Sequence, residues 1–390
     1  MNFDLIVVGA GPVGLAVAAA ARGLSVALVA NARRAPAPVP GVLDARVYTL
    51  SPGNVSFLRD LRAWPSVAPE RLTPVHGMRV FGDRGAKIDF DAYRAGVPEL
   101  AWTVEDGVLQ DALWGVVDAR EKMVVLAPAE CAELTFDSKK ADSKKALLKL
   151  RDGRELSGAL VVGADGASSF VRQQAGIPIK TNDYAQAALI ANLECEKPHA
   201  NIAYQWFQGG PVLALLPLPG RRVSMIWSLP EEDAEMLLQL EPHALCRRVE
   251  SATAGALGAM TVVTPPRSYP LRRLSAARMA GERVALAGDA AHVIHPLAGQ
   301  GLNLGLQDAR ALAAALAGRG PVRDAGDPRL LRCYERSRAE PILAMDLMVD
   351  GLFRLFGADS EPLSRLRNAG LNLSGRLPVL KNILIRHAMS

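Results

Sequence analysis

The first thirty residues alternate between apolar runs and small residues in the order expected of a strand, a helix and a second strand. Residues 3–8 are almost continuously apolar and rich in β-formers, which is typical of a strand buried on both faces. Residues 12–22 predict a helix of small residues, and Val26–Val29 predicts the next strand. A β-α-β unit of this length is typical of a dinucleotide-binding domain.

The middle of the chain has a different pattern. Tyr204–Phe207, Val212–Leu216 and Val223–Ser228 are short β-rich runs separated by turns of glycine and proline. Such runs predict an antiparallel sheet. Val284–Ala287 then returns to the buried-strand pattern, and residues 301–316 predict an alanine-rich helix. We therefore expect an α/β fold in which a Rossmann-like domain is interrupted by an inserted, antiparallel α+β domain.

These patterns also set expected boundaries along the chain. Ser51 followed by Pro52 predicts a helix start, because serine caps helices and proline is favoured at their first position. The C-terminal part predicts helices with breaks at Pro341, Pro362 and Pro378. We expect a Rossmann-like domain of residues 1–75, 100–183 and 270–335, an inserted domain of residues 76–99 and 184–269, and a C-terminal helical segment of residues 336–390.

Composition narrows the possible partners. The chain has 390 residues, of which 49% are hydrophobic and 22% charged, so it can bury a substantial core. Four of its five net positive charges lie in residues 351–390, which argues against a general nucleic-acid surface. None of the four cysteines forms a C-x-x-C pair, so we expect reduced thiols, no bound metal and a cytoplasmic location. The glycines interrupt the apolar run of residues 5–21, which excludes a membrane span there.

The first candidate site is the glycine motif that joins the first strand to the first helix. Gly9 permits a tight turn, Gly11 lets a pyrophosphate approach the backbone, and Gly14 lets the helix pack closely on the strand. The helix N-terminus adds free N–H groups and a partial positive charge. Spacing alone is weak evidence, but its place between strand and helix predicts dinucleotide binding by this segment, Pro12 and Val13 included.

A second candidate site follows the strand at 284–287. Asp289 would stand at the carboxyl end of the sheet, where ligands bind in such folds and where a carboxylate can accept hydrogen bonds from ribityl hydroxyls. Gly299, Gly301 and the small Ala298 leave room for a flat ring, and the following helix would stabilise an anionic reduced flavin. Both motifs together predict FAD, with cofactor contacts from Gly288, Asp289, Pro296, Gly299, Gly301, Leu302 and Asn303, and with the backbone of Pro296, Gly299, Gln300 and Gly301 facing the reaction.

One expected element is missing at the end of the second strand. A carboxylate usually binds the ribose hydroxyls there, but this chain has Ala30 and Asn31. Losing a hydrogen bond to a charged group forfeits roughly 1.5–3 kcal/mol. We expect FAD to bind more loosely than usual, with Asn31 or Arg33 as partial substitutes.

On these motifs the chain resembles class A flavoprotein aromatic hydroxylases of the ubiquinone-biosynthesis hydroxylase family, over essentially its whole length. Further likeness lies in Asp44–Leu50, Val104–Gln110, Val161–Gly166, Leu215–Pro219 and Arg367–Leu371. The resemblance implies a p-hydroxybenzoate hydroxylase-like fold, FAD contacts from Arg46 and Gln110, and a place for Cys131 near the adenine. It also implies that Asp165 serves both FAD and the nicotinamide donor. Asp106-Gly107 departs from the family, which more often has Asn-Arg there.

Several single residues leave two interpretations open. Arg172 either pairs with Asp165 or caps a helix, and His292 and His295 are either proton relays or packing residues. The aromatic residues of the predicted antiparallel sheet either line a substrate cavity or form plain core. On the first interpretation, the substrate contacts are Tyr204, Trp206, Leu215 and Trp227.

The predicted function is hydroxylation of a prenylated phenol or quinone precursor of ubiquinone, with NAD(P)H as transient reductant and O2 as oxidant activated by FAD. Residues 365–386 mix leucines with arginines, so they either contact a membrane peripherally, at the inner face of the plasma membrane, or pack as a helix on the core. A multiprotein quinone-biosynthesis complex is a further expected partner. The alternatives are another FAD oxidoreductase of this fold, although the Trp-x-Trp-x-Ile-Pro signature of halogenases is absent, and a non-catalytic scaffold.

Overall fold

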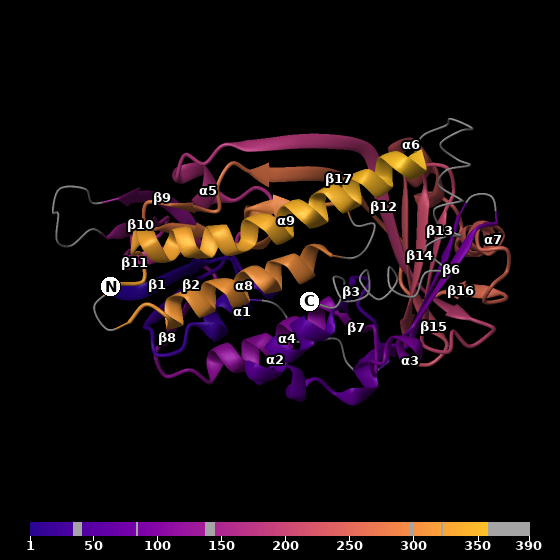
Figure 1. The fold of residues 1–390 in the computed structure, drawn as a ribbon, viewed down its shortest axis with the longest axis horizontal. Helices are drawn as coiled ribbons and strands as arrows, with labels where there is room; N and C mark the ends of the chain where they lie inside the picture. The colour runs from indigo at the N-terminus through magenta and orange to yellow at the C-terminus, as the bar shows by residue number, and fades with distance from the viewer. Residues whose placement is uncertain (34–40, 83–84, 137–144, 296–299, 321–322, 358–390) are drawn as a thin grey trace.

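The computed structural model describes residues 1–33, 41–82, 85–136, 145–295, 300–320 and 323–357. Two large sheets lie at opposite ends of an elongated molecule, and long strands and helices run between them (Figure 1). The mixed α/β fold predicted from the sequence is confirmed.

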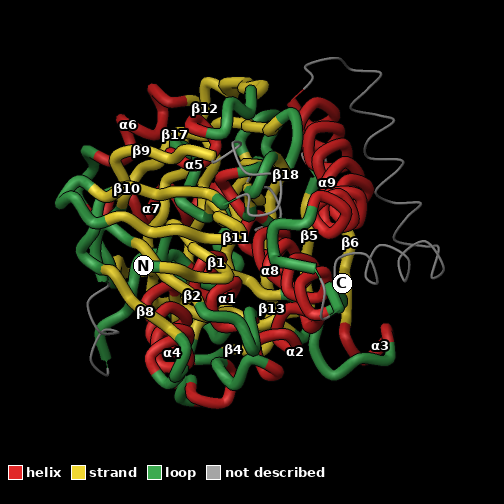
Figure 2. The backbone as a smooth tube through the Cα atoms, turned by 90° about the vertical axis from the view of Figure 1, so that its left-hand side faces the viewer, coloured by secondary structure: helices red, strands yellow, loops and turns green. Residues whose placement is uncertain are grey.

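The sheet at the N-terminal end is built on the predicted β-α-β unit. Its order is β18-β19-β11-β1-β2-β8. The pairs of β1 with β11, β1 with β2, β2 with β8 and β11 with β19 are all parallel. Figure 2 shows β11, β1, β2 and β8 in succession, with helices beside them. The strands span Asn2–Val8 (β1), Val26–Val29 (β2), Met123–Leu126 (β8), Glu155–Gly163 (β11), Ala280–Gly281 (β18) and Val284–Leu286 (β19), with a hairpin of Cys131–Phe136 (β9) and Ala146–Leu150 (β10) attached to β11.

Burial on both faces explains why these strands are continuously apolar. Leu5, Ile6 and Val7 of β1 have no exposed surface, and neither has any residue of β2. Helices α1 (Pro12–Ala20), α4 (Asp106–Asp118) and α8 (Gly301–Ala317) pack together beside this sheet. Side chains from both faces of this sheet and from the three helices thus form one continuous core.

The second sheet is larger and has the order β20-β17-β12-β15-β14-β13-β5-β6. Its pairs are antiparallel except that β13 runs parallel to β5, which the sequence did not predict. Helices α6 (Glu231–Leu238) and α7 (Pro242–Ala252) cover one face. The strands span Gly77–Phe81 (β5), Lys87–Asp91 (β6), Ile179–Cys195 (β12), Ile202–Phe207 (β13), Val212–Leu218 (β14), Arg222–Pro230 (β15), Arg267–Ala276 (β17) and His292–Val293 (β20), with Met260–Val262 (β16) paired to β12.

The proposed domain boundaries remain a prediction, but their relation to the strands is clear. The early segment 76–99 contributes β5 and β6 to the second sheet. The borders placed at 183/184 and 269/270 fall inside β12 and β17, which pair along their length from Ile179 to Ile190. These two borders therefore lie within paired strands of the second sheet.

The remaining elements are several short helices and a small third sheet. Its order is β3-β7-β4, and all its pairs are antiparallel. Ser51 caps α2 by accepting a hydrogen bond from the Asn54 N–H, so the predicted helix start is confirmed. These elements span Val47–Leu50 (β3), Thr73–Val75 (β4), Ala101–Glu105 (β7), Pro52–Asp60 (α2), Ala92–Ala95 (α3), Phe170–Gln174 (α5), Trp64–Ser66 (η1), Pro69–Arg71 (η2) and Gly288–Ala290 (η3).

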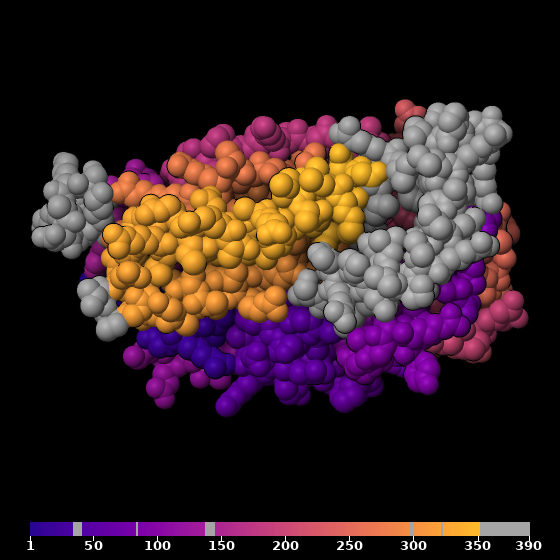
Figure 3. Space-filling model, in the orientation of Figure 1, coloured from indigo at the N-terminus to yellow at the C-terminus, as the bar shows by residue number. Residues whose placement is uncertain are grey.

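The last described helix, α9 (Pro328–Gly357), lies on the surface and spans much of one face of the molecule (Figure 3). The break predicted at Pro341 is wrong, because the helix continues through it. Proline removes one backbone hydrogen bond, and contacts on both sides hold the helix: Tyr334 donates to the Leu286 carbonyl, and buried Val349 packs in a cluster with Phe207 of the second sheet. Pro362 and Pro378 lie outside the described residues. None of the helices described is long and apolar enough to span a membrane.

Candidate functional site

A trough of about 730 Å³ lies between the carboxyl ends of the parallel strands and one face of the second sheet. Its walls include the residues that directly follow β1, β2, β11 and β19, together with side chains of β12, β15 and β17. The structure thus brings together both glycine motifs, which are almost 280 positions apart in the chain. The predicted site residues that line the trough are Gly9, Gly11, Pro12, Val13, Asn31, Arg46, Gln110, Cys131, Asp165, Asp289, Gly301 and Leu302.

Other predicted site residues lie behind the wall or outside the described residues. Gly14 and Gly288 are buried and act through backbone packing. Asn303 is also buried, where its carboxamide accepts from the Ser51 N–H and donates to the Thr49 carbonyl. Gln300 is half-buried and does not line the trough. Pro296 and Gly299 lie outside the described residues.

The first glycine motif has the geometry that each of its glycines was expected to serve. Gly9 has a φ of +106°, and a Cβ there would stand 2.2 Å from the Ala164 carbonyl oxygen. A Cβ on Gly14 would stand 2.0 Å from the Gly9 oxygen, so both positions are closed to side chains. Gly11 differs, because a Cβ there would meet nothing within 4 Å. It caps α1 without a side-chain hydrogen bond, which leaves the first N–H groups free for an anion.

Val13 joins the first motif to the second. A Cβ on Gly288 would lie 3.1 Å from a Val13 methyl, and one on Gly305 would lie 2.5 Å from the same methyl. Gly288 also has a φ of +62°, a left-handed conformation that favours glycine. The absence of side chains at Gly288 and Gly305 therefore leaves the space that the Val13 side chain of α1 fills. This contact sets the distance between the two motifs.

Asp165 brings a carboxylate to the trough at the end of β11. Its Oδ2 accepts a hydrogen bond of 3.1 Å from the Val171 N–H. Its Oδ1 is buried, and the described residues supply it with no hydrogen-bond partner. Nearby, burial and the charge of Asp165 raise the pKa of the Cys131 thiol to about 12, so this cysteine is neutral. A buried acceptor without a partner calls for a hydroxyl or N–H donor from a ligand.

Asp289 supplies a second carboxylate, at the start of the 288–303 segment. It is open to the trough but enclosed by protein elsewhere, and this burial raises its pKa. His292 and Arg46 oppose the shift with their positive charges. The Arg46 guanidinium lies 5.5 Å over the ring of Tyr48, whose pKa is raised mainly by burial. An arginine, a tyrosine and a carboxylate thus converge on one part of the trough.

The Asp106-Gly107 departure is accommodated by local hydrogen bonds. Asp106 accepts a bond of 2.7 Å from the Gln110 side chain, which lines the trough one turn further along α4. The Gly107 N–H donates to Asp44 at 3.1 Å. The aspartate therefore orients Gln110, and the loop is held by a partner in the preceding segment.

The end of β2 offers no charged partner to the trough. Ala30 and Asn31 both line it, while the Ala30 carbonyl accepts from the Ala129 N–H. Arg33 pairs with Asp118 and lies 4.9 Å over the ring of Trp114. Arg33 is thus engaged away from the trough, whereas Asn31 lines the trough at the end of β2.

The predicted substrate residues lie on the face of the second sheet that packs against α6 and α7, away from the trough. Tyr204, Trp206, Leu215 and Trp227 share a core cluster with residues of α6 and α7, and none of them lines the trough. Side chains of a strand alternate between faces. The neighbouring positions Ala188, Ile190, Ser224 and Ile226 face the trough instead, joined by Tyr269. Sequence reasoning missed these five residues, although strand alternation would have found them once one face had been assigned to α6 and α7.

Three polar residues beside the trough have specific structural partners. Arg172 neither pairs directly with Asp165 nor only caps a helix: its guanidinium donates to the carbonyls of Ala290 and Ala167, at 2.9 and 2.8 Å, and so ties the two acidic loops together. His295 is buried against Tyr184 and Gln186, and burial lowers its pKa to about 4. His292 is bonded to Asp308 at 2.7 Å. Neither histidine lines the trough.

A second hollow, of about 850 Å³, lies between α4 and residues 41–43. None of the predicted site residues lines it. Within the described ranges, no group of three or more histidine, cysteine, aspartate or glutamate residues is placed to hold a metal ion.

The trough fits FAD on three observations. The α1 N-terminus is open at Gly11, where a phosphate can approach the backbone. The buried Asp165 Oδ1 atom has no hydrogen-bond donor among the described residues. Arg46, Gln110 and Asp289 add a few polar groups to an otherwise largely apolar lining, as is usual for cofactor sites.

Comparison with known proteins agrees with this geometry. A model of the family described as "FAD binding domain" matches residues 2–345. The chain is 31% identical to the 3-demethoxyubiquinol 3-hydroxylase of Escherichia coli K12, over 99% of this chain and 98% of the relative. It is 34% identical to the ubiquinone hydroxylase UbiL of Rhodospirillum rubrum, over 99% and 89%.

Solved structures show the same fold. The crystal structure of PqsL, a probable FAD-dependent monooxygenase from Pseudomonas aeruginosa, superimposes with a TM-score of 0.79 at 24% identity, covering 95% of this chain and 99% of that one. Klebsiella pneumoniae HpxO, solved with FAD and uric acid, gives a TM-score of 0.75 at 20% identity, over 99% and 97%. The chain belongs to the FAD-binding domain family and, within it, to the flavoprotein monooxygenases of the ubiquinone-biosynthesis hydroxylase group.

Proposed function

We propose that this protein hydroxylates the aromatic ring of a prenylated ubiquinone precursor, with FAD as cofactor and NAD(P)H and O2 as co-substrates. The observation that carries the proposal is similarity along the full chain, at 31% and 34% identity, to two enzymes named as ubiquinone-pathway hydroxylases. The trough supports it, because its polar groups suit a dinucleotide and its other wall is apolar.

The residues of the first sheet would hold the cofactor. The free N–H groups at the start of α1 would bind a phosphate, and Asp165 and Asp289 would accept hydrogen bonds from hydroxyl groups. Arg46 and Gln110 would add hydrogen-bond donors to the same trough. Bound FAD supplies the two-electron reduction by NAD(P)H and the activation of dioxygen. The backbone at Gly301 begins α8 at the trough and places the partial positive charge of a helix N-terminus there.

The second sheet would hold the substrate ring. Ile190 and Ile226 present branched apolar side chains to the trough, next to the small Ala188 and Ser224. Such a wall excludes water and orients a flat ring without supplying a nucleophile. Tyr269, with 42% of its surface exposed, adds an aromatic ring and a hydroxyl at the same wall. These residues replace the four aromatic-sheet residues as the proposed substrate contacts.

The reductant would bind transiently. Across the described ranges, the β1–α1 segment supplies the strand–glycine–helix motif, and the trough that it opens is assigned to FAD. NAD(P)H would therefore reach the trough without a Rossmann unit of its own.

Membrane contact through residues 365–386, attachment to a quinone-biosynthesis complex and a cytoplasmic location are further proposals. The segment lies outside the described residues, and its support is the mixture of leucines and basic residues in the sequence. Flotation with anionic liposomes, comparing the full chain with one that ends at Gly357, tests the contact. Equal flotation of the two would exclude it.

The decisive experiment for the reaction uses the intact gene and the pure protein together. Deleting the gene should cause a prenylated aromatic precursor to accumulate, and mass spectrometry would show which ring carbon lacks oxygen. The purified FAD-loaded protein should then add one atom of ¹⁸O from ¹⁸O2 to that precursor with NAD(P)H. An unchanged quinone profile, or a colourless protein that takes up no added FAD, would favour the scaffold alternative.

A further inference from the structure

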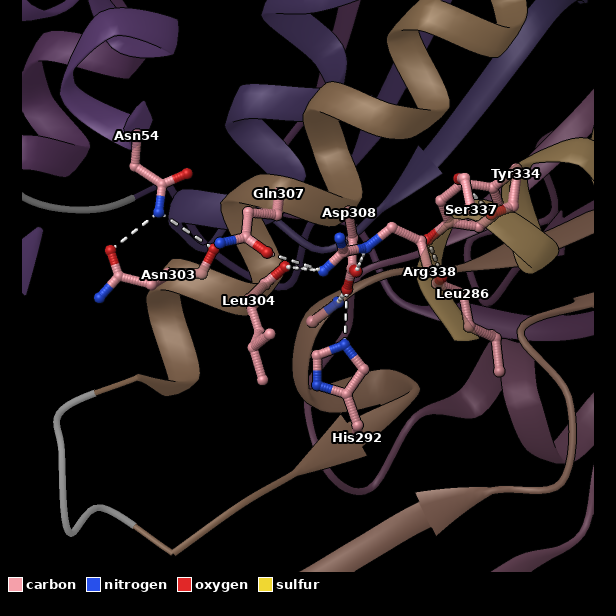
Figure 4. A network of polar contacts seen from close by, with 11 residues as sticks. Asn54, Leu286, His292, Asn303, Leu304, Gln307, Asp308, Tyr334, Ser337 and Arg338 are labelled. Atoms are coloured by element: carbon pink, nitrogen blue, oxygen red, sulfur yellow. Dashed lines mark hydrogen bonds and ion pairs between the residues drawn. The ribbon is translucent and has the colours of Figure 1, made fainter. Parts of the chain in front are cut away.

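Three charged side chains are buried together behind the trough, at the junction of α8, α9 and the loop after β19. Asp308 of α8 has no exposed side-chain surface, and His292 and Arg338 are 4% and 5% exposed. The Asp308 carboxylate accepts from His292 Nε2 and from Arg338 Nε, both at 2.7 Å (Figure 4). One acid is thus shared by two bases that come from different elements.

The three groups stabilise one another's charges. Burial acts to raise the pKa of Asp308, but His292, Arg338 and the Gly288 N–H together hold it below its ordinary value. Burial likewise acts to lower the pKa of His292, and attraction to Asp308 outweighs it, so this pKa is raised. The cluster therefore favours an ionised Asp308 carboxylate, which lies beside a guanidinium and favours the protonated form of the His292 imidazole.

The third partner of Asp308 is the backbone of the second motif. Asp308 Oδ2 accepts the Gly288 N–H at 2.9 Å. Gly288 is the left-handed residue against which Val13 packs, and Asp289 of the trough follows it directly. The position of Asp289 is therefore fixed on one side by Val13 of the first motif and on the other by the buried carboxylate.

We propose that Asp308 is a positioning residue for the cofactor, which holds the Gly288–Asp289 turn against the α1 N-terminus, and that Arg338 acts through it from α9. The inference rests on FAD binding in the trough and not on which substrate is hydroxylated. A protein that binds FAD without hydroxylating any tested phenol still tests it.

The cost of burial argues that this cluster does more than fill the core. Buried ion groups usually stabilise a fold no better than apolar residues of the same size, because desolvation offsets their attraction. In this cluster, the other hydrogen bonds of Asp308 and Arg338 go to residues next to the trough. Arg338 also donates to the Leu304 carbonyl and to Gln307 in the first turns of α8, the helix that begins at the trough. The network thus orients both the acidic turn and the start of α8.

The experiment compares two matched aspartate variants of the full chain. Asp308→Asn keeps the shape and removes the charge that orders the turn. Asp346→Asn removes the ion pair of α9 with Arg273, which involves neither Gly288 nor His292. FAD is removed from each protein, its dissociation constant is measured by fluorescence titration, and the unfolding temperature of the apoprotein is recorded.

We expect Asp308→Asn to raise the FAD dissociation constant by at least about tenfold, the loss expected for a hydrogen bond to a charged group. Asp346→Asn should leave it within about twofold of the wild type. If Asp308→Asn gives no folded apoprotein, the Arg338→Met variant tests the proposal instead, because Asp308 then keeps its hydrogen bonds to His292 and Gly288. We expect Arg338→Met to raise the FAD dissociation constant by about threefold. A folded variant whose FAD affinity equals that of the control overturns the proposal. A folded wild type that binds no FAD overturns the cofactor assignment and this inference with it.

Discussion

The two walls of the trough are built on different principles. The wall from the first sheet works through backbone: Gly9 and Gly14 are closed to any side chain, and Gly11 opens the helix N-terminus. The wall from the second sheet works through side chains, and which residues form it depends on strand alternation: Ile226 faces the trough, whereas its neighbour Trp227 is core. The first wall can be predicted from glycine spacing, because the contacts at Gly9 and Gly14 leave no room for a side chain. The second cannot, because either face of a strand could be the open one.

The largest effect should separate two glycines of the first wall. Gly14→Ala places a Cβ about 2 Å from the Gly9 oxygen, so we expect loss of folded protein or a destabilisation above about 4 kcal/mol. Gly11→Ala meets nothing within 4 Å, so the apoprotein should keep its stability while FAD affinity falls at least about tenfold. Denaturant unfolding of apoprotein and FAD titration measure the two effects. Equal stability losses would contradict the division of roles.

The two faces of the second sheet should likewise differ in their response to substitution, one in stability and the other in substrate binding. Trp227→Ala should destabilise the protein by about 3–5 kcal/mol, as expected when a large aromatic is removed from a core. Ile226→Ala should cost about 1 kcal/mol, because the side chain is only half-buried, and should raise the KM for the aromatic substrate. Unfolding curves and steady-state kinetics report the two. A KM effect confined to Trp227→Ala would reverse the assignment of faces.

His295, which packs against Tyr184 and Gln186 of the second sheet, should make stability depend on pH. Its pKa is about 4 in the folded protein and about 6.5 when unfolded, so below pH 6.5 the unfolded state binds more protons. The unfolding free energy contributed by this group is complete above pH 6.5 and falls by about 3 kcal/mol down to pH 4. Urea unfolding between pH 7 and pH 4 measures the slope. His295→Gln should flatten it, and an unchanged slope would assign the effect to other groups.

A smaller effect is expected when the missing carboxylate is restored at the end of β2. Ala30 lines the trough where related folds bind ribose hydroxyls with an acid, so Ala30→Glu should tighten FAD binding by roughly 1.5–3 kcal/mol. Isothermal titration of apoprotein with FAD measures it. Tight retention of FAD by the wild type, with no gain in the variant, would show that Asn31 already satisfies the site.

The smallest effect is expected at Arg33. Its exposed side chain is occupied by Asp118 and Trp114, so Arg33→Ala should leave FAD affinity within about twofold. The same titration serves as the measurement, with Ala30→Glu as the responsive reference. A larger loss would return Arg33 to the cofactor site.

Local signals in the sequence were sufficient for elements that are stabilised locally. Ser51 caps α2 as predicted, and the apolar runs at 3–8 and 26–29 are the buried strands β1 and β2. The break predicted at Pro341 was wrong for a related reason. Proline weakens a helix by one hydrogen bond, but Tyr334 and Val349 anchor α9 to partners in other elements, and no local pattern reveals those partners.

Where a residue had more than one suitable partner in the sequence, the tertiary structure determined which partner it contacts. Arg172 had two interpretations in the sequence, and the structure gave it a third, two carbonyls on separate loops. Asp308 carried no motif that linked it to the cofactor, yet it holds the turn beside Asp289. Its bond to Arg338 joins residues thirty positions apart on two helices, and helix packing alone brings them together.

The N-terminal β-α-β unit, the dinucleotide motif and the need for FAD followed from the sequence alone, because glycine spacing and apolar periodicity act over a few residues. The tertiary structure decided which face of the second sheet is open, which carboxylates reach the trough, and how a buried charge cluster supports one of them. Those features depend on groups that are distant in the chain, and only packing determines whether such groups meet.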